Sequence, residues 1–113
     1  MSASIPLVFH PIYSQLDLPE RHRFPIEKYQ GIHDALQVRG IPANAFIRPE
    51  PLSVAGLKAY YDHDYVDQLT TGTLDAKAMR RIGFAWSEQL IQRTLTAVGG
   101  TCLTAELALE NGI

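Results

Sequence analysis

The chain has 113 residues, of which 46% are hydrophobic and 19% are charged, and its formal net charge is -2. This length predicts one domain, residues 1–113, with the composition of an ordinary globular protein. The charge balance gives no electrostatic reason to expect a nucleic acid or an acidic membrane as a partner. No stretch reaches the roughly 18 uninterrupted apolar residues of a membrane span.

The single cysteine, Cys102, excludes an internal disulfide and favours a reducing compartment. It lies in an apolar run, so we expect a buried small hydrophobic residue rather than a nucleophile. The N-terminal residues do not have the charged and then apolar pattern of a secretory signal. The sequence therefore predicts a cytoplasmic protein.

Two short apolar runs predict strands. Residues 5–9, IPLVF, combine branched and aromatic side chains and end before a His-Pro pair, as in a buried strand. Residues 44–51, NAFIRPEP, predict a second short strand. The long loop 10–23 has no helical period, and loops that leave the end of a strand in α/β proteins often carry function.

Residues 25–40 predict an amphipathic helix. Pro25 suits the first helical position, and Gly40 suits the position just beyond the end. His33 falls on the polar side, so we expect it to be solvated. The expected buried stripe recurs at three- and four-residue spacing and consists of Ile26, Tyr29, Ile32 and Leu36.

Three short helices are expected between residues 53 and 83. Ser53 is a candidate N-cap of the first, and Gly72 and Gly83 are expected to end the other two. The triplet Asp62-His63-Asp64 has the residue types of a metal site, but consecutive side chains point in different directions. We therefore interpret it as a polar helix start.

The clearest element is a helix in the segment 86–113, with Ser87 as its N-cap and Asn111-Gly112 at its end. It is apolar nearly all round, which is typical of a helix buried in a larger protein. Gly99 and Gly100 lower helix stability by about 1 kcal/mol each, so we expect a neighbouring backbone to approach closely there. Ile113 stands where a further strand is expected, which indicates an unfinished α/β pattern.

Composition and spacing alone predict an α/β piece without a complete active site. The histidines have no metal-ligand spacing, and no phosphate loop or nucleophile elbow occurs. The densest chemical stretch is PERHRF, residues 19–24, which fits an anion site, a catalytic cluster or an ordinary helix cap. One alternative is an unrelated small α/β enzyme that uses His10, Asp17, His22 and Arg23.

Three stretches, in order, resemble the N-terminal part of the histone deacetylase superfamily, which includes bacterial acetoin-utilization-type and acetylpolyamine deacetylases. They are LPERHRFPIEKYQGIHDAL (18–36), LKAYYDHDYVDQL (57–69) and TAVGGTCLTAELALENGI (96–113). They are similar to the family's first active-site loop, its Leu–x–x–x–His–x–x–x–Tyr segment and its Gly-Gly helix. The resemblance implies an α/β fold class: the incomplete N-terminal part of an arginase/deacetylase-like three-layer fold, with a parallel sheet flanked by helices.

The resemblance also implies zinc-dependent hydrolysis of an acetyl-lysine-like amide or an acetylated amine. In that chemistry a metal-bound water attacks a zinc-polarised carbonyl, with a histidine as general base. The family's zinc ligands and catalytic histidines come after the part that this chain matches. We therefore expect a truncated fragment without catalytic residues or bound zinc, inactive by itself.

Among the residues of this chain, Arg23 matches the family's arginine that lines the inner cavity behind the zinc, where a guanidinium suits a carboxylate. His22 and Pro19 match loop positions near the rim. Two departures matter for the substrate. Tyr61 stands where the family usually has a histidine, and the loop at 81–87 lacks the acid that positions peptide substrates in many eukaryotic members. These departures make a peptide substrate less favourable and leave small amines or other acylated compounds as candidate substrates.

The main alternative is a stand-alone interaction domain that reuses the half-fold and hides its apolar helix in an oligomer. A fragment is expected to be unstable or to aggregate through that helix. An interaction domain is expected to form a discrete dimer or higher oligomer. The sequence leaves the oligomeric state open.

Overall fold

The structure is a computed structural model that describes residues 5–112. Helices make up 57% of it and strands 4%. The elements are, in chain order, β1 (Leu7–Val8), the 3-10 helix η1 (Pro11–Ser14), α1 (Lys28–Val38), the 3-10 helix η2 (Ala43–Ala45), β2 (Phe46–Ile47), α2 (Val54–Lys58), α3 (His63–Thr71), α4 (Ala76–Ile82) and α5 (Glu88–Glu110).

The two strands form one parallel pair, and α1 lies in the connection between them. In register, Leu7 lies opposite Phe46 and Val8 lies opposite Ile47. One further bond runs from the Phe9 N–H to the carbonyl of Ile47 at 3.1 Å. Pro6 precedes β1 and Pro49 follows β2. Since proline has no N–H to donate, these positions limit the ladder to a few residues.

The expected three-layer fold, the N-terminal part of an arginase/deacetylase-like architecture, is therefore wrong for the described chain. Both apolar runs do contain strands, but each strand spans two residues, and helices supply most of the structure. The backbone measures 53 × 35 × 17 Å. Three stacked layers would place the outer layers alone about 20 Å apart, so this molecule is too thin for that arrangement.

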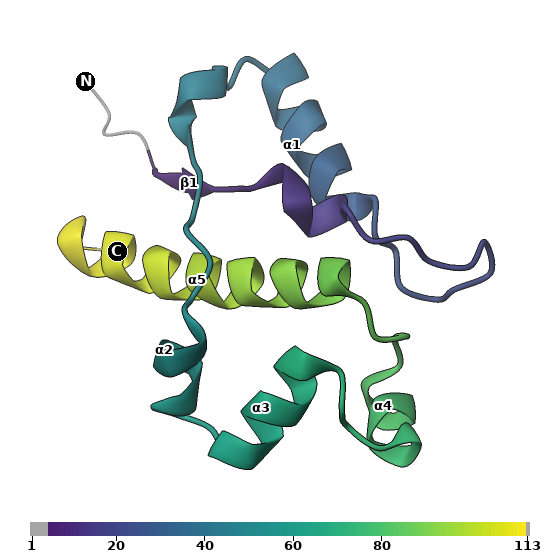
Figure 1. The fold of residues 1–113 in the computed structure, drawn as a ribbon. Coiled ribbons are helices and arrows are strands. Elements are labelled where there is room, and N and C mark those ends of the chain that lie inside the picture. Colours follow the sequence, from purple (N-terminus) through teal and green to yellow (C-terminus); the bar gives the residue numbers. More distant parts are fainter. Residues whose placement is uncertain (1–4, 113) are drawn as a thin grey trace.

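Helix α5 runs through the middle of the molecule (Figure 1). The β1 and α1 elements lie along one side of it, and α2, α3 and α4 lie along the other. The segment 48–53 crosses α5 and joins the two sides. The Leu52 N–H donates to the carbonyl of Leu95 at 3.0 Å, which fastens the crossing segment to the helix.

The glycine pair of α5 makes room for this crossing. A Cβ atom on Gly99 would overlap the carbonyl oxygen of Glu50, and one on Gly100 would overlap the hydroxyl of Tyr13. Both glycines are buried. The prediction that a neighbouring backbone approaches the helix at this pair is confirmed.

The main core lies between α2, α3 and the first half of α5. Its buried members are Leu57, Val66, Ile91 and Leu95, with Leu52, Val54, Leu69, Trp86 and Val98 packed around them. The Trp86 indole N–H donates to the carbonyl of Leu69 at 2.7 Å. The Trp86 ring also packs on Gly72, whose positive φ of 76° ends α3.

Most of the predicted helix ends are confirmed, and the start of α1 is the exception. Three side-chain caps accept backbone N–H groups: Ser53 from Gly56, Asp62 from Tyr65 and Ser87 from Leu90. Gly40 has a φ of 103°, and its N–H donates to Gln37 while the Ile41 N–H donates to Leu36. This pair of bonds is a Schellman motif.

The triplet Asp62-His63-Asp64 is a helix start, because Asp62 caps α3. Within residues 5–112 no three His, Cys, Asp or Glu side chains are grouped to hold a metal ion.

The expected buried stripe of α1 is partly wrong. The helix begins at Lys28 rather than Pro25, and Ile32 is 58% exposed. His33, which we expected to be solvated, instead packs against Phe9 and Phe46, with ring centroids 4.1 and 4.4 Å apart. Phe9, which directly follows β1, and Phe46 of β2 offer a stacking surface, and α1 places the imidazole on it.

The burial of α5 holds for its first half only. Leu109 is 83% exposed, and Cys102 is also exposed, so the prediction of a buried cysteine is wrong. The second half extends beyond the elements that cover the first (Figure 1). The strand expected at Ile113 lies outside the described residues. Over residues 5–112, no helix combines the length and the hydropathy needed to cross a membrane.

Candidate functional site

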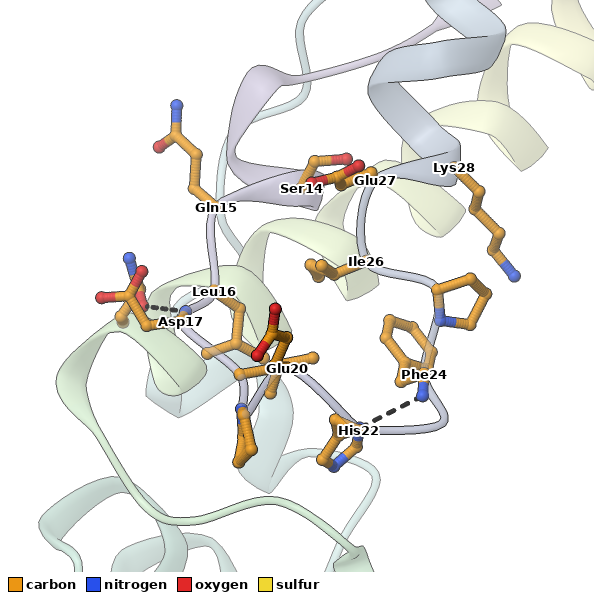
Figure 2. Close-up of a pocket in the computed structure, with 14 residues that line it drawn as sticks. Ser14, Gln15, Leu16, Asp17, Glu20, His22, Phe24, Ile26, Glu27 and Lys28 are labelled. Atoms are coloured by element: carbon orange, nitrogen blue, oxygen red, sulfur yellow. Dashed lines mark hydrogen bonds between the residues drawn. The ribbon is translucent and has the colours of Figure 1, made fainter.

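The loop between η1 and α1 folds around a cavity of about 790 Å³ (Figure 2). The start of α5 closes one side of it through Gln89. Two of the three predicted site residues, Pro19 and His22, line this cavity. Its charged and polar lining also includes Ser14, Gln15, Asp17, Glu20, Glu27 and Lys28. The cavity is therefore rich in carboxylates, with one lysine at its edge.

Hydrogen bonds and packing anchor the loop along its length. The Asp17 N–H donates to Gln89 Oε1 at 2.8 Å. The Gln30 N–H donates to Ser14 Oγ at 3.1 Å, which joins the first turn of α1 to η1. Leu16 is only 7% exposed. The cavity wall is therefore tied to α1 and α5.

His22 uses both of its ring nitrogens in this loop. Its Nδ1 accepts the N–H of Phe24 at 3.1 Å, as Figure 2 shows. The Nε2 atom therefore carries the proton and donates to the carbonyl of Gly83 at 2.9 Å. The imidazole also stacks on Phe84, with the centroids 5.1 Å apart. His22 ties the loop to the segment after α4, and in this arrangement it has no free lone pair to act as a base.

Arg23 lies elsewhere. It is exposed and is not among the residues that line the cavity. The roles given to Arg23, His22 and Pro19 by resemblance stay predictions. For the alternative small enzyme, the structure brings Asp17 and His22 to the same cavity, while His10 and Arg23 are outside its lining.

Arg93 is a residue of this region that sequence reasoning did not single out. Its Nε donates to the carbonyl of Tyr13 at 2.8 Å. Its guanidinium carbon lies 5.2 Å from the ring centroids of both Phe24 and Tyr29, which is cation–π contact. Arg93 thus holds η1, the end of the loop and α1 against α5. One feature of the sequence could have indicated Arg93, because it is the single basic residue of α5.

His10 has a structural position at the start of η1. Its Nδ1 accepts the N–H of Ile12 at 3.0 Å, which caps the 3-10 helix. Burial lowers the pKa of His10, and the charge of Arg48 lowers that pKa further, while Glu50 opposes the change. The neutral imidazole is the form that accepts this bond, so hydrogen bonding and burial favour the same state.

Acidification is expected to destabilise the folded chain through His10. Its folded pKa lies below the ordinary 6.5, so the unfolded chain binds the proton first. The stability from His10 is therefore complete above pH 6.5 and is lost as the pH falls through the folded pKa. His10→Asn keeps a cap acceptor that does not titrate. We expect urea unfolding from about pH 7 to about pH 5 to show a smaller loss of unfolding free energy in this variant than in the wild type.

Equal acid sensitivity of the two proteins would contradict this role of His10. The titration of the Asp34 carboxyl also changes stability, but at a lower pH than the range of this His10 experiment. Hydrogen bonds from His33 and Gln30 lower the pKa of Asp34 from its ordinary 3.8, so the stability from Asp34 is present above that pH and is lost below it.

Comparison with known proteins gives one clear relative and no functional description. No family model matches the chain. An uncharacterized protein of Picosynechococcus sp. (strain PCC 7002) is 46% identical over 110 residues. The matched segment covers 96% of this chain and 36% of the relative. The chain therefore spans about a third of the length of the relative that it matches.

Proposed function

We propose that the chain is the N-terminal part of a cytoplasmic zinc-dependent deacetylase of the histone deacetylase family. In the longer protein it would act in the hydrolysis of an acetylated lysine or an acetylated amine. The observation that supports this most is the anchored loop cavity, because Pro19 and His22 from the resembling motif line it together. The three motifs that carry the resemblance support the proposal independently.

The described residues do not fit a zinc site by themselves. In this proposal the zinc ligands and the general base belong to other parts of the longer protein, and no catalytic step is assigned to this chain. The chain supplies one wall of the site. Arg23, now exposed, becomes covered by the rest of the protein, where its guanidinium donates to the carboxylate product.

The exposed surface supports a chain that works within a larger structure. Its accessible area is 8154 Å². A compact monomer of 12.6 kDa exposes about 6,200 Å². The difference, about 2,000 Å², exceeds the roughly 800 Å² that each partner of a standard-sized protein interface buries.

The full-length relative provides the test. We expect the purified protein from Picosynechococcus to contain zinc and to release acetate from an acetyl-lysine peptide or an acetylated diamine. Removal of zinc with a chelator should abolish acetate release, because the metal polarises the scissile carbonyl. The 113-residue chain, assayed beside it, should release none. Metal analysis and an acetate assay measure both properties.

A full-length relative without zinc and without acetate release would overturn the family assignment. Acetate release by the 113-residue chain alone would overturn its assignment as a non-catalytic part. The exposed second half of α5 favours one other candidate, a stand-alone oligomeric interaction domain. Light scattering that shows a discrete dimer, together with a relative that binds no zinc, would support that candidate instead.

A further inference from the structure

Three tyrosines are exposed where α2 meets α3. Tyr60 is 84% exposed, Tyr61 59% and Tyr65 42%. None of them lines the loop cavity. Tyrosine is enriched in protein interfaces because its ring supplies a large contact area with few rotatable bonds and a polar tip. Their grouping therefore marks this junction as a candidate interaction surface.

Backbone hydrogen bonds hold the junction in place. The N–H groups of Tyr60 and Tyr61 both donate to the carbonyl of Leu57, at 3.2 and 3.1 Å. The Asp62 carboxylate accepts the N–H of Tyr65 at 2.9 Å. Leu57 itself is buried in the core. The rings therefore project from an ordered backbone, so a partner would lose little of its binding free energy to ordering this segment.

The charge around these rings is negative. Asp62 and Asp64 are both exposed beside the tyrosines. The nearby Asp67 is already paired, because Lys58 Nζ lies 2.6 Å from its Oδ1. Among the described residues no lysine or arginine pairs with Asp62 or Asp64, and both are neighbours of the three tyrosines in the sequence.

We propose that this tyrosine surface, made of Tyr60, Tyr61, Asp62, Asp64 and Tyr65, binds an arginine-containing basic segment of a partner protein. A guanidinium stacks on a tyrosine ring and donates to a carboxylate at the same time. A lysine ammonium offers neither the flat face nor the forked donors, so the surface prefers arginine. The two aspartates repel a phosphate-rich partner. The proposal does not depend on the deacetylase assignment.

Fluorescence anisotropy of labelled peptides titrated with the protein tests the proposal. The probe is a peptide of alternating arginine and glycine, and the matched probe replaces every arginine by lysine. We expect the arginine peptide to bind several-fold more tightly. The double variant Tyr60→Ala/Tyr61→Ala should weaken its binding about tenfold or more, as loss of interface anchors does. Asp64→Asn should weaken it by about threefold.

Two controls separate recognition from folding and from general charge attraction. Tyr60→Phe/Tyr61→Phe keeps both rings and should retain binding of the arginine peptide. Glu106→Gln removes an exposed acid of α5 and should leave binding unchanged. Equal binding of the two peptides, or equal effects of Asp64→Asn and Glu106→Gln, would overturn the proposal. Self-association of the chain that the tyrosine-to-alanine variant abolishes would also overturn it, because the occupant would then be a second copy.

Discussion

Replacement of Gly99 by alanine is expected to destabilise the fold by about 3 kcal/mol, the upper part of the range for overpacking a tightly filled position. The added methyl group would overlap the carbonyl oxygen of Glu50, which belongs to a backbone segment and cannot rotate away. The hydrogen bond from Leu52 to Leu95 would then also lengthen, because it fastens the same segment. Urea unfolding of the two proteins measures the difference.

Gly31→Ala is the matched control in another helix. Gly31 lies inside α1, and a Cβ there would meet nothing within 4 Å. Alanine has the higher helix propensity, so this variant should gain about 0.5–1 kcal/mol of stability. Propensity alone predicts the same gain at Gly99. Because only Gly99 is crowded, the two substitutions should change the free energy of unfolding in opposite directions. A stabilised Gly99→Ala would contradict the crossing of 48–53 over α5.

Loss of the Arg93 guanidinium is expected to have the second largest effect. Arg93→Met keeps an unbranched apolar side chain but removes the bond to the Tyr13 carbonyl and the stacking on Phe24 and Tyr29. We expect a loss of about 2 kcal/mol, since one charged hydrogen bond and a cation–π contact disappear from a half-buried position. Urea unfolding measures this change, and hydrogen exchange of residues 10–27 should become faster.

Arg93→Lys and Arg81→Met complete this experiment. Lysine keeps the charge but has no Nε–H to donate to Tyr13 in the same geometry, so its effect should be intermediate. Arg81 is exposed on α4, and its loss should change stability by less than about 0.5 kcal/mol. If Arg93→Met and Arg81→Met behaved alike, Arg93 would not be the residue that holds the loop against α5.

The helix ends could be predicted because their causes are local. Ser53 and Ser87 each accept an N–H from the first turn that follows them, and a residue type with a short polar side chain suffices to recognise them. Gly40 and Gly72 adopt the positive φ that other residues avoid. The close approach at Gly99 and Gly100 could also be predicted, because glycines weaken the middle of a helix and indicate that a neighbour leaves no room for a side chain.

The candidate site could be predicted only in part. The stretch 19–24 was found from its composition, and Pro19 and His22 do line a cavity. The Nδ1 partner of His22, the Phe24 N–H, is local, but its Nε2 partner Gly83 and the stacked Phe84 lie about sixty residues further along the chain. Arg93 was missed because its partners come from η1 and α1. No pattern within α5 reveals them.

The sequence by itself determined the order of the elements, most of their ends, the two strand positions and the close approach at Gly99. These features follow from backbone conformation and from side chains acting within one or two turns. Only the tertiary structure decided that the strands stay short, that His33 and not Ile32 faces the aromatic rings, and that Cys102 is exposed. A helical period shows how wide an apolar face is, whereas the neighbours that cover that face come from distant parts of the chain.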